Sequence, residues 1–294
     1  MRLRVLILGY GEMGHAMKFL LAKRHDVRIW NRASKINLEE ETSQAQVILF
    51  CLPVRAHFGI ISRVEAHLAS YCLCLSIAKG LDESGRTAPQ VLGSVLSGKS
   101  SYGVMYGPMI AEDILLGHYA FADVALSNMH DFSTVRQLFL SSTLICKQVP
   151  DMLGCSWLAA LENVYAIMFG IAEELELGGN MRGYLMVTAV SEIANIAQSL
   201  GAQAQTVYSY AGLGDLLTTA SSENSHHHQL GRKLASMQDF VLTGEGVNTL
   251  WMTAKFNLLD AQTYPLFNLI GEIVAQPKQI NFRLGEYFKQ ISTW

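Results

Sequence analysis

The sequence predicts an α/β fold, in which an N-terminal Rossmann-type doubly wound sheet is followed by an all-helical C-terminal domain. Three observations predict it. Short aliphatic runs alternate with helix-like segments up to about Pro150, a glycine-rich turn follows the first of these runs, and long helical stretches follow Asp151. Because such a change of rhythm separates an α/β unit from an all-helical one, we place the two domains at residues 1–150 and 151–294.

The expected strands of the N-terminal half are aliphatic or β-branched runs. In chain order they read RVLIL, VRIW, QVILFCL, YCLCLSI, YGVMY, FADVAL and LICKQV. Helix-like segments such as EMGHAMKFLLAKR and TAPQVLGSVLSG separate most of them. Apolar strands that alternate with helices are typical of a mostly parallel sheet with helices on both faces. The C-terminal half opens with two long helical stretches, MLGCSWLAALENVYAIMFGIAEELEL and GYLMVTAVSEIANIAQSLGA.

The turn LILGYGEMG lies between the first expected strand and the first expected helix. Gly9, Gly11 and Gly14 form a G-x-G-x-x-G pattern, with Glu12 and Met13 inside it. Glycines at this spacing let the backbone approach a pyrophosphate held at a helix N-terminus. The strand before the turn and the helix after it favour dinucleotide binding by these five residues. The alternative is a glycine-rich turn without a ligand.

The end of the second expected strand, DVRIWNRAS, is where such folds select their cofactor. An acidic residue there would bind the ribose hydroxyls of NAD, but Asn31, Arg32 and Ser34 occupy the segment instead. A guanidinium beside small hydrogen-bonding side chains suits a phosphate monoester. The sequence therefore favours NADP over NAD. A solvated surface arginine is the alternative, and many enzymes accept both cofactors.

Composition argues against several other classes of protein. The net charge is −3 and the basic residues are scattered, so neither nucleic acid nor an anionic membrane is an expected partner. The five cysteines, mostly in apolar runs, favour reduced thiols in a cytoplasmic protein over disulfides or a zinc site. The apolar start breaks at Gly9, too early for a signal peptide, and no apolar run reaches the ~18 residues of a membrane span.

Six further motifs follow the glycine turn in a fixed order: SIAKGLDESGR, YGPMIAEDILLG, ENVYAI, GGNMRG, AGLGDLLTT and NSHHHQLG. In these motifs the chain resembles the bacterial type of NAD(P)-dependent glycerol-3-phosphate dehydrogenase over nearly its whole length. The resemblance implies hydride transfer between a nicotinamide ring and C2 of dihydroxyacetone phosphate or glycerol 3-phosphate, with the substrate between the two domains. It also implies a part in glycerophospholipid metabolism and a homodimer that pairs through the helical domain.

The same resemblance assigns roles to individual residues. Lys79, just beyond the expected strand CLCLSI, matches the family's lysine that touches substrate and cofactor. It also lies at the carboxyl edge where doubly wound sheets bind ligands. Asp215 in GLGD matches the family's catalytic-site aspartate, and Thr219 follows it on the next helical turn. The alternatives are an exposed turn lysine and an ordinary helix-capping aspartate.

The resemblance also places site residues in a further loop. Gly107 and Met109, in the motif GPM, fall on the family's substrate-side loop, although the family more often has a hydroxyl residue at the position of Met109. Ala111 falls where the cofactor passes in the family.

The motif ENV departs from the family at its centre. Asn163 matches the family's asparagine, but Glu162 stands where the family has the lysine that donates and accepts the proton. Helical neighbours of position 162 are apolar, so an unpaired carboxylate there would be costly. We expect Lys79 to pair with Glu162, or Glu162 to act as a protonated acid with a raised pKa. A partly exposed glutamate at a helix edge is the alternative.

A second departure lies in NSHHHQLG. Ser225, His226 and His227 stand where the family has an SRN segment, whose arginine holds the substrate phosphate and the cofactor. An imidazole can donate to a phosphate but is mostly neutral at pH 7, so we expect weaker phosphate binding. His226 is expected to remain on the cofactor side as well. Side chains of three consecutive histidines diverge, so we expect no metal site.

The segment VLTGEGVNT completes the comparison. Thr243 and Gly246 stand at the positions of a family glutamate and arginine, whereas Asn248 and Thr249 persist. The losses lie around the substrate phosphate and the proton donor, while the glycine turn is intact. Cofactor binding is therefore better supported by the sequence than turnover.

Three hypotheses follow. The first is an active dehydrogenase of the glycerol-3-phosphate type, with Lys79 performing acid–base catalysis and Glu162 orienting it. The second is a diverged dehydrogenase that acts on another, less anionic small ketone or hydroxy compound. The third is a non-catalytic NADP-binding homologue that keeps the dimer interface. The whole-chain resemblance ranks the first hypothesis highest.

Overall fold

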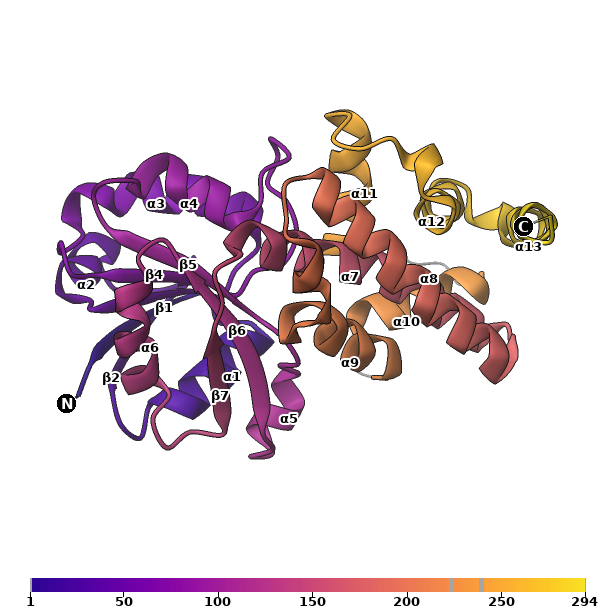
Figure 1. Ribbon diagram of the computed structural model, residues 1–294. Helices are drawn as coiled ribbons and strands as arrows, with labels where there is room; N and C mark the ends of the chain where they lie inside the picture. Colours follow the sequence, from indigo (N-terminus) through magenta and orange to yellow (C-terminus); the bar gives the residue numbers. More distant parts are fainter. Residues whose placement is uncertain (1, 223–224, 238–240, 294) are drawn as a thin grey trace.

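The computed structural model describes residues 2–222, 225–237 and 241–293. The N-terminal half is a sheet with helices on both sides, and the C-terminal half is a set of helices beside it (Figure 1). The seven expected strands are all present, namely β1 Arg4–Leu8, β2 Asp26–Trp30, β3 Val47–Phe50, β4 Leu73–Ser76, β5 Ser101–Tyr106, β6 Ala120–Leu126 and β7 Leu144–Gln148.

The sheet has the order β2-β1-β3-β4-β5-β6-β7. All neighbouring strands pair in parallel except β5 and β6, which are antiparallel. The mostly parallel sheet is thus confirmed. Each strand from β3 to β5 is largely buried, as the continuous apolar runs predict for strands covered on both faces.

Six helices cover the two faces of the sheet. Side chains of α1 (Glu12–Leu21), α5 (Ala111–Leu115) and α6 (Phe132–Leu138) pack on one face. Those of α2 (Leu38–Gln44), α3 (His57–Val64) and α4 (Ala88–Leu96) pack on the other. Alternate strand residues belong to the two clusters, Ile7 to the first and Leu8 to the second, because successive side chains of a strand point to opposite faces. The doubly wound architecture follows.

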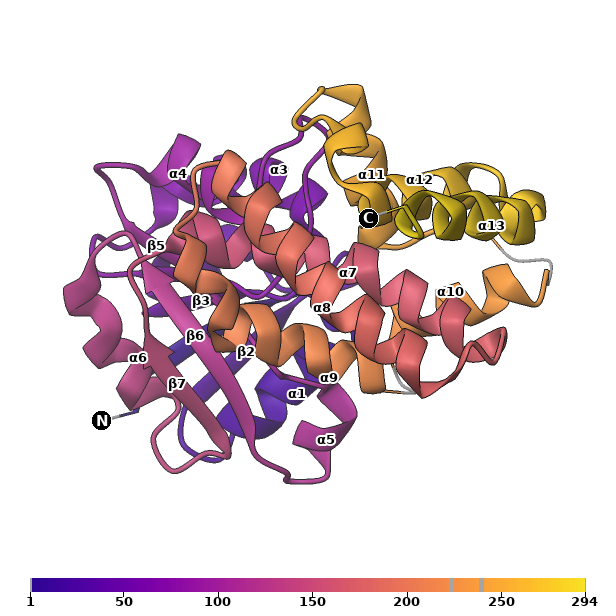
Figure 2. The same cartoon turned by 45° about the vertical axis from the view of Figure 1, so that its right-hand side comes forward.

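The C-terminal half is built around α7 (Met152–Glu174), the longest described helix. Packed around it are α8 Gly178–Ser199, α9 Asp215–Ser221, α10 His226–Ala235, α11 Glu245–Lys255 and α12 Pro265–Ala275, while α13 Ile280–Ile291 packs on α12. Figure 2 shows α7 running behind α8, with α10 and α11 on either side of it. Short 3₁₀ segments (Val54–Ala56, Glu65–His67, Met129–Asp131, Ala204–Tyr208, Ala261–Thr263, Pro277–Gln279) and one π-helical turn (Tyr210–Gly214) connect these elements.

The apolar helix α7 is a core helix of the protein. By length and mean composition it is the one described helix that could cross a membrane, although Ser156, Glu162 and Asn163 interrupt its apolar run. Its most apolar stretch is completely buried by other parts of the chain. Asp151 caps the N-terminus of α7; its carboxylate accepts a hydrogen bond from the N–H of Gly154 and another from Thr206 Oγ1. Asp151 therefore fixes the start of α7 against the segment that leads to α9.

Candidate active site

A cavity of about 310 Å³ lies between the sheet and the helical half, and we call it the cleft. Sixteen residues from both halves line it: Glu12, Met13, Ile77, Lys79, Met109, Ile110, Ala111, Glu112, Glu162, Asn163, Asp215, Thr219, Ser225, His226, His227 and Glu245. The strand-side residues follow β4 and β5 or begin α1, so the cleft lies at the carboxyl edge of the sheet, where open α/β folds bind ligands.

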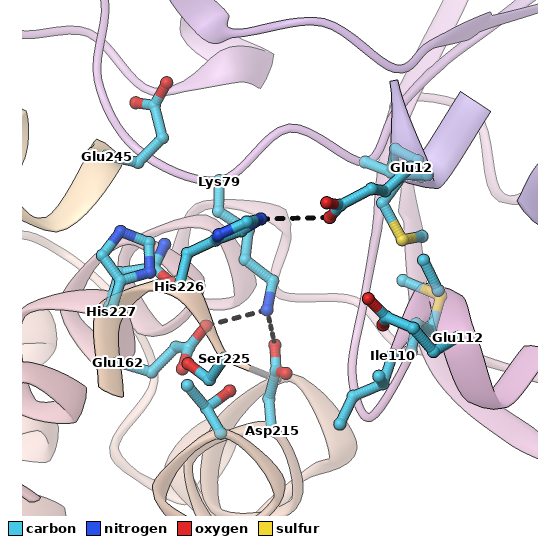
Figure 3. A pocket seen from close by; sticks show the side chains of 16 residues that line it. Glu12, Lys79, Ile110, Glu112, Glu162, Asp215, Ser225, His226, His227 and Glu245 are labelled. Carbon is cyan, nitrogen blue, oxygen red and sulfur yellow. Dashed lines mark hydrogen bonds and ion pairs between the residues drawn. The ribbon is translucent and has the colours of Figure 1, made fainter. Parts of the chain in front are cut away.

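Lys79 lies at the centre of the cleft, between two carboxylates (Figure 3). Its Nζ donates a 2.8 Å hydrogen bond to Glu162 Oε1 and forms a 2.7 Å ion pair with Asp215 Oδ2. The expected pairing of Lys79 with Glu162 is confirmed. Lys79 is 24% exposed, whereas the side chains of Glu162 and Asp215 are 1% and 3% exposed, so both acids are held in the interior by one cation.

Burial and neighbouring charges together set the protonation of Lys79 and Asp215. Burial alone would lower the pKa of Lys79, but Asp215 and Glu162 together outweigh it and hold that pKa above its ordinary value. Burial raises the pKa of Asp215 to about 8; Lys79 opposes this rise and the Glu162 charge adds to it. Two carboxylates share one ammonium, and Asp215 can therefore carry a proton near neutral pH.

Local structure explains how the two acids reach the same lysine. Glu162 lies in the middle of α7, which is buried from Gly154 to Ala172. Asp215 is the first residue of α9, directly after a π-helical turn that contains Gly212. A β-carbon at Gly212 would collide with the backbone of Val207, so this turn requires glycine. The turn directs Asp215 toward the cleft, and the acid lies in the first turn of α9, where negative charge is favourable.

His226 and His227 occupy different environments in the cleft. The Nε2 atom of His227 accepts a hydrogen bond of 3.0 Å from the N–H of Gly246, and burial lowers the pKa of His227 to about 3. His227 is therefore neutral, with its hydrogen on Nδ1. His226 is exposed, and its Nε2 lies 3.0 Å from Glu12 Oε2. That contact joins α10 to the glycine turn (Figure 3).

Ser225 and Asn248, in the same region, have structural partners. Ser225 Oγ caps α10 by accepting from the N–H of His228, whose ring faces Glu173. The three consecutive histidines thus face Glu12, Gly246 and Glu173, in different directions. Asn248 Nδ2 donates to the carbonyl of Leu81, and Thr249 is buried.

Glu245 is a cleft residue that the sequence analysis missed. It is the first residue of α11, and a β-carbon at Gly80 would collide with its carboxylate. Burial raises the pKa of Glu245 to about 7, against the influence of Arg55. Thr243, to which the sequence analysis assigned the family's glutamate position, does not line the cleft. An acid between two glycines in TGEG was the available signal. Ile77, Ile110 and Glu112 also line the cleft without having been predicted.

The glycine turn has the geometry that a dinucleotide site requires. Gly9 has φ +99°, and a β-carbon there would lie 2.5 Å from the carbonyl oxygen of Cys51. A β-carbon at Gly14 would collide with the carbonyl of Gly9, whereas one at Gly11 would meet nothing within 4 Å. Two glycines are thus required by the fold itself, and the third leaves open space beside the N-terminus of α1. These residues fit a pyrophosphate.

A second cavity, of about 480 Å³, lies beside the end of β2, and we call it the β2 cavity. Gly9, Asn31, Arg32 and Arg55 line it together with apolar groups. Arg55 was not predicted, because it follows β3 rather than β2. Ser34 does not line this cavity; its Oγ accepts from the N–H of Asn31, and Asn31 Oδ1 accepts from the N–H of Ala33.

The structure brings most of the predicted site residues together. All predicted catalytic residues line the cleft, although the Asn163 amide donates to the carbonyl of Ala159 within its own helix. Met109 and Ala111 also line it. Gly107 does not; it has φ +151° in a close turn against Phe121. Of the residues predicted to bind the cofactor, Gly11, Gly14 and Ser34 line neither cavity.

The sequence comparisons with known proteins all find relatives of the same enzyme. Family models described as the N-terminus and the C-terminus of NAD-dependent glycerol-3-phosphate dehydrogenase match residues 33–131 and 151–282. "Glycerol-3-phosphate dehydrogenase [NAD(P)+]" of Acaryochloris marina is 32% identical over 254 residues, which are 83% of this chain and 82% of that protein. The enzyme of the same name from Gloeobacter violaceus is 30% identical, over 92% of each chain.

Solved structures agree on the fold. A glycerol-3-phosphate dehydrogenase from Coxiella burnetii superposes with a TM-score of 0.84 at 21% identity, over 97% of this chain and 99% of that one. The glycerol-3-phosphate dehydrogenase of Saccharomyces cerevisiae superposes with a TM-score of 0.78 at 19% identity, over 96% of this chain and 99% of that one. The matches in sequence show that the chain belongs to the NAD-dependent glycerol-3-phosphate dehydrogenase family.

Proposed function

We propose that the protein is a nicotinamide-dependent oxidoreductase that interconverts a small ketone and its alcohol in the cleft. The observation that carries this proposal is the placement of Lys79, between Glu162 and Asp215 and close to the glycine turn. The family and the names of the relatives make dihydroxyacetone phosphate and glycerol 3-phosphate the first substrates to test.

The residues of the cleft can perform the acid–base part of this reaction. When bound, the nicotinamide supplies a hydride to the carbonyl carbon, and the carbonyl oxygen needs one proton. Lys79 and Asp215 together hold exchangeable protons at neutral pH, and we assign them the proton transfer. Glu162 orients Lys79 through its hydrogen bond. Ile77, Met109 and Ala111 provide apolar walls that exclude water from the reacting carbon.

NADP is the cofactor that we infer to be preferred. Arg32 and Arg55 place two guanidinium-bearing side chains around the β2 cavity, and no carboxylate lines it among the described residues. Two guanidinium groups favour binding of the 2′-phosphate of NADP. The acidic residue that would select NAD is replaced by Asn31 at the end of β2.

A second candidate function is reduction of another small ketone that lacks the phosphate. It is favoured by Glu162, which stands where the sequence analysis expects the family's catalytic lysine, and by the neutral state of His227.

We also propose that residues 1–150 form the cofactor-binding domain and that residues 151–294 form the domain that binds substrate and pairs in a homodimer. A cytoplasmic location and a part in glycerophospholipid metabolism complete the proposal.

The test of the proposed function has two measurements. Titration with NADPH and NADH, followed by cofactor fluorescence, should show binding, with the tighter binding for NADPH. Oxidation of NADPH with dihydroxyacetone phosphate, and then with a panel of small ketones, should show turnover. Cofactor binding without turnover of any ketone would instead support a non-catalytic NADP-binding protein, and failure to bind either cofactor would refute the proposal. Light scattering after gel filtration tests the homodimer.

A further inference from the structure

One oxygen of Glu162 has no partner in the described part of the chain. Oε1 accepts from Lys79, but Oε2 is buried and receives no hydrogen bond. The residue is 1% exposed and lines the cleft, and Figure 3 shows its carboxylate turned toward Lys79 and the interior of the cleft. A buried carboxylate oxygen normally receives donors. The unpaired oxygen therefore points to a ligand group that brings a hydrogen-bond donor into the cleft.

The charges around the cleft favour a positively charged ligand group. Its described lining contains five acids (Glu12, Glu112, Glu162, Asp215 and Glu245) and a single lysine or arginine, Lys79. Lys79 is already shared by Glu162 and Asp215. Protonation of Asp215 and Glu245 near neutral pH still leaves more carboxylates than cations. His227 is neutral and His226 faces Glu12, so a phosphate dianion would find no unshared cation among these residues.

We propose that the cleft binds a small carbonyl compound, or the matching alcohol, that carries a protonated amine next to the reacting carbon, with an ammonium N–H donating to Glu162 Oε2. This inference rests on the proposed function and replaces the phosphate of the family's substrate by a cation. In the reduction, the carbonyl carbon gains the hydride of NADPH, the carbonyl oxygen gains the proton held by Lys79 and Asp215, and the amine keeps its protons. A cavity of about 310 Å³ accommodates a molecule of this size.

The test compares three ketones that differ in charge: aminoacetone, hydroxyacetone and dihydroxyacetone phosphate. Aminoacetone and hydroxyacetone have nearly the same shape, so their ratio of kcat/KM isolates the ammonium. We expect the wild-type protein to favour aminoacetone over each of the others by about tenfold or more, the usual value of a charge-assisted hydrogen bond. Preference for dihydroxyacetone phosphate, or no preference among the three, would overturn the inference.

Glu162→Gln is the decisive variant, since it keeps the shape and an oxygen for Lys79 but removes the charge. It should bring the ratio of aminoacetone to hydroxyacetone close to one. Glu174→Gln, on the same helix but outside the cleft, is the matched control and should leave that ratio at its wild-type value. An unchanged ratio in Glu162→Gln would show that Glu162 does not bind the amine.

Measurements of ligand binding distinguish failure of this inference from failure of the proposed function. If no ketone is reduced, calorimetric titration with the same three compounds in the presence of NADP⁺ still reports the selectivity of the cleft. Tighter binding of aminoacetone that is lost in Glu162→Gln supports the inference without any turnover. Tighter binding of dihydroxyacetone phosphate, or binding of none of the three, refutes it even if the cofactor itself binds.

Discussion

Lys79, just after strand β4, donates a 2.8 Å hydrogen bond to Glu162 in the middle of helix α7. The two residues are 83 positions apart in sequence and belong to different halves of the fold. Their contact places a carboxylate at the position where the family's catalytic lysine is expected, and it compensates that carboxylate with the lysine of the opposite wall. The buried carboxylate of Glu162 is therefore compensated by a lysine from the other half of the fold.

Lys79→Met should destabilise the protein and abolish turnover. It leaves the buried acids Glu162 and Asp215 without their cation, and breaking a buried pair in this way costs about 3 kcal/mol or more. Urea denaturation gives the free energy of unfolding. The double variant Lys79→Met with Glu162→Gln should lose less than the sum of the two single changes. Additive losses would show that Lys79 and Glu162 are not coupled.

The rate of ketone reduction should fall as the pH rises through about 8, the value to which burial raises the pKa of Asp215. Asp215→Asn should lower the rate and remove that limb from the pH profile. For stability, a raised carboxyl pKa contributes most below the ordinary value of 3.8, and the contribution declines as the pH rises toward about 8. The stability of the wild type relative to Asp215→Asn should therefore decrease over this range.

Two glycine substitutions should separate folding from cofactor binding. Gly14→Ala places a β-carbon against the carbonyl of Gly9, so it should lower both the free energy of unfolding, by about 1–3 kcal/mol, and the affinity for cofactor. Gly11→Ala meets open space in the protein and should leave stability nearly unchanged. Weaker NADPH binding by Gly11→Ala would then report directly on the close approach of the pyrophosphate, and unchanged binding would place the cofactor elsewhere.

Arg32→Ala and Arg55→Ala should each weaken NADPH binding by about tenfold, because each removes a charge-assisted contact with the 2′-phosphate. Binding of NADH, which lacks that phosphate, should change much less. The NADPH to NADH ratio of dissociation constants in the two variants, measured by fluorescence titration, checks this. Equal losses for both cofactors would assign these arginines to a part that the cofactors share.

Glu192→Ala should destabilise the helical half without affecting the cofactor site. The buried Glu192 carboxylate accepts from the N–H groups of Leu266 and Phe267 at the start of α12 and from Tyr165 Oη. Removing it leaves these donors unpaired, at a cost of about 3 kcal/mol. Tyr165→Phe should cost only about 1 kcal/mol, because one neutral hydrogen bond is lost. Thermal unfolding and NADPH titration together provide the test.

The sequence by itself determined the architecture. The apolar run VILF in β3 predicts a strand that is buried on both faces. Gly9 has a positive φ, which favours glycine at that position. The glycine turn and the family motifs named most of the residues that line the cleft, and the apolar surroundings of position 162 required a partner for its charge. The same local signals did not reveal Glu245, which begins α11, or Arg55, which lies in the 3₁₀ segment Val54–Ala56. Each lines a cavity that residues distant in sequence form only in the folded chain.

Only the tertiary structure decided how the charges combine. It placed Asp215 on the second side of Lys79, left one oxygen of Glu162 without a donor among the described residues, and turned His226 toward Glu12. These relationships join segments that are up to 214 positions apart. Coulomb interactions and desolvation depend on distance and burial in space, and no order of residues along a chain specifies either quantity before the chain has folded.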